Sequence, residues 1–169
     1  MAIKNIITYP NPVLRQQAKK VTQFDEELKK LAEDMGETMY DAPGIGLAAN
    51  QIGVLLQVIV VDVTELDDEK KFKTYVNPVI SEGEGSEVDE EGCLSVIDYT
   101  SQVKRFKKIK FTAQDIEGNT IEFEAEDRLA RIFQHEVDHL HGKLFIDRIS
   151  TLKRSLYKKK LKKILQSKS

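Results

Sequence analysis

Apolar residues recur at the spacing of one helix face in two stretches of this chain. The first stretch, DEELKKLAEDMGETMYDA, begins with Asp25 as a suitable N-cap, and Pro43-Gly44 ends the pattern. Its apolar residues lie three or four positions apart and are Leu28, Leu31, Met35 and Met39. The second stretch runs over residues 128–141, and its apolar residues are Leu129, Ile132, Phe133, Val137 and Leu140. We expect both stretches to be helices that bury one face.

Several shorter segments have the composition of strands. Residues 55–63 are apolar and β-branched, which predicts a buried strand. Residues 73–80 are a further candidate, which Asn77-Pro78 restricts to a sheet edge or a strand end. The segments 107–115 and 120–127 flank Glu117-Gly118-Asn119, which is a hairpin signal. Helices and strands are mixed without regular βαβ alternation, so we predict an α+β fold.

The composition is that of one globular domain. A chain of 169 residues can bury a core, and 40% hydrophobic with 32% charged residues excludes a disordered or membrane protein. No apolar run approaches the roughly 18 residues that span a bilayer, and the first residues lack the apolar stretch of a signal peptide. The single cysteine, Cys93, excludes an intramolecular disulfide and suits a reducing compartment. We expect a cytoplasmic protein with neither DNA nor a membrane as a partner.

The segment QHEVDHLHG, residues 134–142, contains His-Glu-x-x-His within the second predicted helix. Residues four apart lie on one helix face, so His135 and His139 can direct their imidazoles at one metal ion. Glu136 projects at a neighbouring angle, from which it can accept a proton from a metal-activated water. Two histidines hydrogen-bonded locally on a helix surface are the alternative.

The third metal ligand must come from elsewhere in the chain. His141 follows His139 by only two residues and points away from it on a helix. Cys93, in DEEGCLSV at the end of a predicted strand over residues 87–94, is the other candidate, although a single cysteine is more often a small buried hydrophobe. A Cys/His/His set leaves a fourth position open, which is a catalytic arrangement.

A segment rich in small residues, APGIGLAANQIG, joins the first predicted helix to the first predicted strand. Small residues permit close approach of the backbone to a ligand, or merely a tight turn. Gln51 near its end offers a side-chain amide that could stabilise a developing oxyanion.

Together, GIGLAANQ, EGCLS and QHEVDHLHG resemble the three signature motifs of the peptide deformylases, in the family's order. The resemblance covers essentially the whole chain and is closest to the compact bacterial type. It implies mixed, mainly antiparallel sheets around a central metal-binding helix, with a C-terminal helix. It also implies a metal-dependent hydrolase that removes the N-formyl group from the formylmethionine of nascent polypeptides and releases formate.

The resemblance implies roles for nine residues. The ligands of one divalent metal, Fe(II) in the cell and Zn or Ni in a purified sample, would be Cys93, His135 and His139. Glu136 would take a proton from water and deliver one to the departing amine, while Gln51 and the backbone N–H of Leu94 would bind the formyl oxygen. The positions that hold the peptide as an extended strand would be Ile45, Gly46 and Gly92.

The chain departs from the family's pattern at two positions. Ile97 stands where relatives usually have proline, which frees φ at that position and removes no proposed ligand. Arg128 stands where relatives often have an apolar residue, on the helix face that helps line the methionine pocket. Its methylenes can contact a substrate while its charge reaches water.

Charge is unevenly distributed along the chain. Residues 151–169 hold eight Lys or Arg and no acid, whereas the remainder holds 18 basic and 28 acidic residues, a formal charge of −10. We expect residues 1–150 to form a single catalytic domain, with residues 151–169 as a basic C-terminal helix or tail packed on it or extending from it. The tail is either a solvated helix face or a contact with ribosomal RNA. We give the two interpretations about equal weight, because an enzyme that acts on nascent chains benefits from a place near the ribosome.

Two other functions compete with deformylation. A His-Glu-x-x-His metalloprotease would need a third ligand other than Cys93. A non-catalytic module with a structural metal would need a fourth protein ligand. The sequence offers no obvious residue for either.

Overall fold

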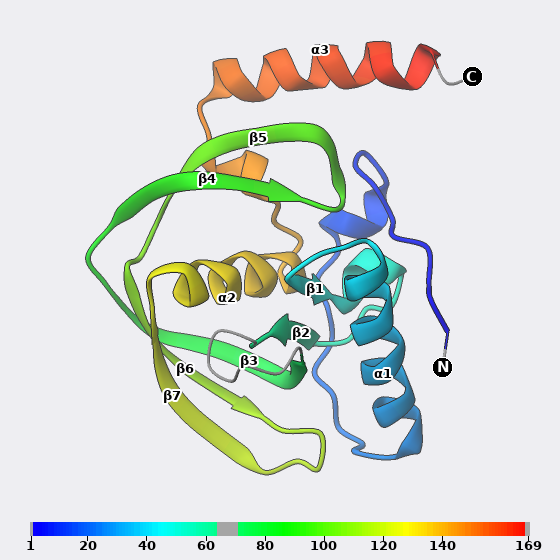
Figure 1. Ribbon diagram of the computed structural model, residues 1–169, viewed down its shortest axis with the longest axis vertical. Coiled ribbons are helices and arrows are strands. Elements are labelled where there is room, and N and C mark those ends of the chain that lie inside the picture. The colour runs from blue at the N-terminus through cyan, green and yellow to red at the C-terminus, as the bar shows by residue number, and fades with distance from the viewer. Residues whose placement is uncertain (1, 64–70, 168–169) are drawn as a thin grey trace.

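A computed structural model describes residues 2–63 and 71–167 of the chain (Figure 1). The helices are α1 (Glu26–Asp41), α2 (Asp127–Leu140) and α3 (Thr151–Ser167). The strands are β1 (Gly46–Ala48), β2 (Val58–Asp62), β3 (Phe72–Glu84), β4 (Glu87–Cys93), β5 (Val96–Arg105), β6 (Lys108–Gln114) and β7 (Thr120–Glu126). None of the helices that the structure describes is long and apolar enough to cross a membrane.

Helix α2 lies between two antiparallel sheets (Figure 1). On one side is a five-stranded sheet of order β1-β2-β3-β6-β7, and on the other is the two-stranded hairpin β4–β5. Helix α3 crosses over the outer side of this hairpin. The arrangement confirms the predicted α+β fold, with mainly antiparallel sheets around a central helix and a helix at the C-terminal end.

Two predicted elements form where local signals place them. Asp25 caps α1, because its Oδ1 accepts a hydrogen bond from the Leu28 backbone N–H at 3.1 Å. The apolar face of α1 is buried at Leu28, Met35 and Met39, and partly buried at Leu31. The hairpin β6–β7 turns at Gly118, whose φ of +91° favours glycine.

Strand β3 contradicts the expectation of an edge strand or a strand end, because it pairs with β2 on one side and β6 on the other. The register shifts between Val76 and Val79, so Asn77-Pro78 lies in a bulge, where proline removes no ladder hydrogen bond. The Asn77 side chain replaces the missing ladder contacts by accepting from Val21 N (2.8 Å) and donating to Val21 O (3.0 Å).

Strand β2 begins at Val58, three residues later than predicted. The backbone groups before Val58 are hydrogen-bonded to the N-terminal segment, because Lys19 N donates to Leu55 O at 2.9 Å and Gln57 N donates to Lys19 O at 2.8 Å. The N-terminal segment therefore takes the place of a sheet partner at residues 55–57, and the strand begins after them.

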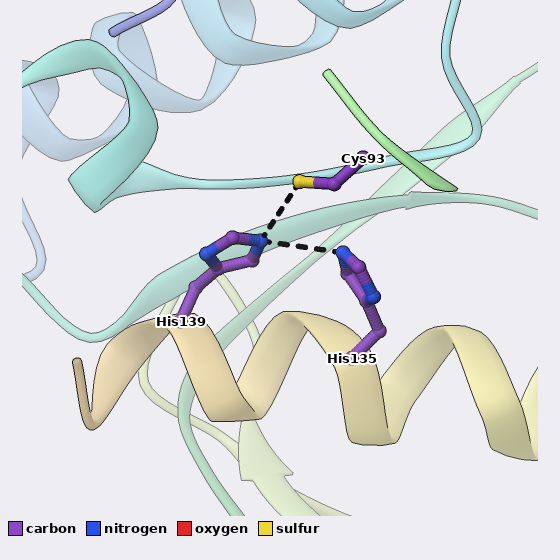
Figure 2. A group of neighbouring side chains, drawn as sticks. All are labelled: Cys93, His135 and His139. Carbon is purple, nitrogen blue, oxygen red and sulfur yellow. Dashed lines mark hydrogen bonds between the residues drawn. The ribbon is translucent and has the colours of Figure 1, made fainter. Parts of the chain in front are cut away.

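One face of α2 packs into the core of the five-stranded sheet. Phe133 of α2 contacts Phe111 and Tyr75, with ring centroids 4.5 Å and 5.0 Å apart. These contacts orient the helix so that its opposite face, which carries His135 and His139, lies beneath the β4–β5 hairpin (Figures 1 and 2).

Candidate metal centre and active site

The structure brings together the three predicted metal ligands. The donor atoms of Cys93, His135 and His139 all lie within 4.8 Å of one another. His139 Nε2 is 3.4 Å from Cys93 Sγ and 3.3 Å from His135 Nε2 (Figure 2). The two imidazoles rise from successive turns of α2, and the thiol descends from the end of β4 (Figure 2).

This donor set fits a divalent cation. One sulfur and two imidazole nitrogens converge from two layers of the fold, and thiolate with imidazole is a donor set that transition metals prefer. Among the described residues the group has three members, and three protein ligands are the number that catalytic zinc sites use. His141 is exposed and is not among them.

The carboxylate of Glu91 orients His135. Its Oε1 accepts a hydrogen bond from His135 Nδ1 at 2.9 Å, and this contact holds the ring so that Nε2 faces Cys93 and His139. The same carboxylate accepts hydrogen bonds from Arg105 Nε at 2.8 Å and from Arg105 Nη2 at 2.9 Å. Burial raises the pKa of Glu91, but Arg105 and His135 outweigh it and hold the pKa well below its ordinary value.

The charged network continues to Asp138, one turn after His135 on α2. Arg105 Nη1 donates to Asp138 at 2.6 Å, and Arg148 donates to both oxygens of Asp138 at 2.7 and 2.8 Å. Burial raises the pKa of Asp138, but the two guanidinium groups lower it overall. These residues were not predicted from the sequence. Only Glu91 left a signal, because period-two alternation places it on the same strand face as Cys93.

Glu136 is a buried carboxyl beside the three ligands. Burial raises its pKa to about 7. Its Oε1 has no hydrogen-bond partner among the described residues. Gly46 of β1 lies against it, and a Cβ at position 46 would be 2.5 Å from Glu136 Oε2. The absence of a side chain at Gly46 therefore lets this carboxyl reach its place, where it can exchange a proton near neutral pH.

The side-chain amide of Gln51 has a defined orientation. Its Oε1 accepts from the Ala48 backbone N–H at 2.9 Å, so its Nε2 faces Ser95 Oγ at 3.0 Å and Cys93 Sγ at 3.6 Å. An N–H donor therefore lies next to the thiol. Leu94 occupies the two-residue turn between β4 and β5, directly after Cys93.

Two of the three candidate metal ligands and the groups beside them border one cavity of about 650 Å³. Its lining includes Gln51, Cys93, Leu94, His135 and Glu136. The residues predicted to hold the peptide also line it, and they are Ile45, Gly46 and Gly92. Arg128 lines the cavity too, as expected from its place on α2. A cavity of this size accommodates a ligand of several residues beside the candidate metal centre.

Comparison with known proteins identifies relatives of this chain. Residues 3–155 match the family model described as polypeptide deformylase. A peptide deformylase from Desulfotalea psychrophila is 56% identical over 164 residues, covering 96% of this chain and 97% of that protein. A peptide deformylase from Syntrophobacter fumaroxidans is 49% identical over 166 residues, covering 98% of both chains.

Solved structures agree with this result. The crystal structure of a peptide deformylase from Legionella pneumophila has a TM-score of 0.90 and 45% identity, covering 99% of each chain. That of a peptide deformylase from Ehrlichia chaffeensis in complex with actinonin has a TM-score of 0.90 and 34% identity, covering 96% of this chain and 98% of that one. The chain therefore belongs to the polypeptide deformylase family.

Proposed function

We propose that this protein hydrolyses the N-formyl group from the formylmethionine of nascent polypeptides and releases formate. The observation that carries the proposal is the Cys/His/His donor set beside a cavity that is also lined by a buried carboxyl and an amide donor. Family membership supports the same reaction.

Glu136 is the proposed proton carrier. It accepts a proton from the attacking water and delivers one to the departing amine, a role that suits its raised pKa. Gln51 Nε2 and the backbone N–H of Leu94 are the proposed donors to the formyl oxygen as it becomes an oxyanion. Donors of this kind contribute about 3 kcal/mol each to transition-state stabilisation.

Cys93, His135 and His139 are the proposed ligands of one divalent metal. A cation in this position would supply Lewis acidity, which lowers the pKa of a bound water and polarises a carbonyl. We propose Fe(II) in the cell, with Zn or Ni able to take the same site in a purified sample, because thiolate and imidazole accept each of these ions. Metal analysis of anaerobically purified protein tests this choice.

The same cavity is the proposed peptide site. Ile45, Gly46 and Gly92 would contact the backbone of an extended peptide, and Arg128 would contact its first side chain through methylene groups. The geometry favours neither a protease with another third ligand nor a structural metal clip. Among the described residues, no fourth protein ligand joins the group.

The test is formate release from a formyl-Met peptide by anaerobically purified protein, compared with Glu136→Ala and with metal content measured for both. We expect formate from the wild type only, and about one metal ion per chain in each protein. Absence of formate from metal-loaded wild type would refute deformylation. Cleavage of an unformylated peptide would instead indicate a protease.

Helix α3 supports a second part of the proposal, which is contact with the ribosome from the cytoplasm. Its exposed residues include many lysines, namely Lys153, Lys158, Lys159, Lys160, Lys162 and Lys163. Clustered positive charge attracts ribosomal RNA, and this attraction weakens with salt. We expect deletion of residues 153–169 to reduce co-sedimentation with ribosomes at low salt. Unchanged co-sedimentation would refute this contact.

A further inference from the structure

Strand β5 leaves its ladder with β4 close to the metal centre. Cys93 pairs with Val96, but the next pair is Gly92 with Thr100, so residues 97–99 bulge out of the hairpin. Asp98 in this bulge has a φ of +53°, a conformation that residues other than glycine rarely adopt. A bulge releases backbone groups from the ladder, and those groups need other partners.

Helix α3 supplies these partners. Tyr157 donates its hydroxyl to Ile97 O at 3.0 Å, and Lys160 Nζ donates to Asp98 O at 2.9 Å. The Tyr157 ring, only 1% exposed, also stacks on Tyr99 with centroids 4.6 Å apart. The bulge is thus held from outside the hairpin by the helix that crosses over it in Figure 1.

The bulge also borders the proposed catalytic cavity. Asp98 and Tyr99 line that cavity, as do Val96 and Thr100 on either side of the bulge. The contacts of Tyr99 also lead toward the metal centre, because its ring stacks on Phe145 at 6.1 Å. Phe145 in turn stacks on the ligand His135 at 6.2 Å.

We infer that Tyr157 and Lys160 are positioning residues that hold the bulge over residues 97–99 as one wall of the substrate cleft. Helix α3 thereby sets the affinity for peptide substrates. The inference rests on the proposed deformylase function. It also bears on Ile97, which stands where relatives usually have proline. Without proline, φ at this position is not fixed by a ring, and the bulge depends on hydrogen bonds from α3.

The experiment compares Tyr157→Phe and Lys160→Met with wild type on two substrates, a formyl-Met tripeptide and the shorter formyl-Met amide. Losing one hydrogen bond should raise KM for the tripeptide about three- to tenfold. We expect kcat to stay within about twofold, because a positioning role leaves the metal ligands in place. If the residues after methionine are the ones that contact the bulge, the shorter amide should keep its kcat/KM, and Lys160→Arg should restore the tripeptide KM.

Two matched controls accompany these variants. Tyr75→Phe removes a tyrosine hydroxyl in the core of the five-stranded sheet, and Lys159→Met removes an exposed lysine next to Lys160 on α3. Neither should change KM. An equal rise in KM for Lys159→Met would overturn the inference, because the effect would then come from the charge of the helix.

Hydrogen exchange over residues 96–100 provides a readout that does not need catalysis. Tyr157→Phe should exchange about three- to tenfold faster there than wild type. Unchanged exchange together with unchanged KM would overturn the inference, and so would a loss of kcat at constant KM. If wild type released no formate, deformylation would be refuted, and exchange over residues 96–100 would still decide whether α3 holds the bulge.

Discussion

Replacing Glu91 with glutamine keeps the shape of this side chain and removes its charge. The wild-type carboxylate is only 5% exposed and accepts hydrogen bonds from His135, Arg131 and both nitrogens of one edge of Arg105. A glutamine presents one oxygen and one NH₂ group to these donors. Whichever way the amide is turned, an N–H faces another N–H.

The cost of Glu91→Gln has two parts. Removing one partner of a buried ion pair destabilises a protein by about 3–5 kcal/mol. Arg105 keeps its ion pair with Asp138 at 2.6 Å. We therefore expect a decrease in the free energy of unfolding at the lower end of this range, about 3 kcal/mol. Loss of the negative charge behind His135 should weaken metal binding about 10- to 100-fold.

Two assays separate these effects. Urea unfolding of the metal-free proteins gives the change in stability. Competition with a chromophoric chelator for Zn²⁺ gives the change in metal affinity. Glu90→Gln is the matched control, because Glu90 is an exposed neighbour whose acceptor oxygen for Thr100 Oγ1, at 2.8 Å, survives in glutamine.

The outcome that would refute the reasoning is specific. If Glu91→Gln lost stability but bound Zn²⁺ within about twofold of wild type, the charge of Glu91 would not support His135 as a metal ligand. If both measurements matched those of Glu90→Gln, the buried network would contribute nothing measurable.

Three other predictions concern different parts of the molecule. Gly46→Ala should push the Glu136 carboxyl from its place and lower kcat for a formyl-Met peptide about a hundredfold, with metal content unchanged; normal kcat would contradict this. Burial raises the pKa of Tyr75 to about 12 from its ordinary 10.0, so the stability from its protonated phenol is fully present below pH 10 and is lost as pH rises toward 12. In urea unfolding, Tyr75→Phe should therefore retain a larger share of its neutral-pH stability at pH 11, and an equal decline in both proteins would count against it. Leu161→Ala, at a position only 3% exposed, should cost about 2 kcal/mol and speed hydrogen exchange in α3, whereas the exposed Lys162→Ala should do neither.

Features that depend on neighbouring residues could be predicted from the sequence. Helical periodicity alone places His135 and His139 on one face of α2, and Glu117-Gly118-Asn119 predicts its hairpin. The interior position of β3 could not be predicted, because the contacts that accommodate Asn77-Pro78 come from residues 56 and 37 positions away.

The outer network of the candidate site was hidden for the same reason. Glu91 stands inside a predicted motif, yet its partners Arg105 and Arg131 lie 14 and 40 residues further along the chain. Nothing local distinguishes these arginines from surface charges. The contact between Tyr157 and Ile97, 60 residues apart, is equally invisible in the sequence. Short motifs therefore predict which groups do chemistry, and only the fold reveals what holds them.

The dispersal of the site along the chain has a consequence for how the protein is made. The residues that line the cavity come from separate elements, and they include Gly46 of β1, Gln51 of the turn after it, Cys93 of the hairpin and His135 of α2. During synthesis the growing polypeptide thus has no complete site until α2 has left the ribosome and docked on the sheet. By the proposed function, the first residue of each new copy is then a substrate for copies completed earlier. Production of the enzyme in a cell is in this sense self-dependent, because each generation of molecules is processed by the one before it.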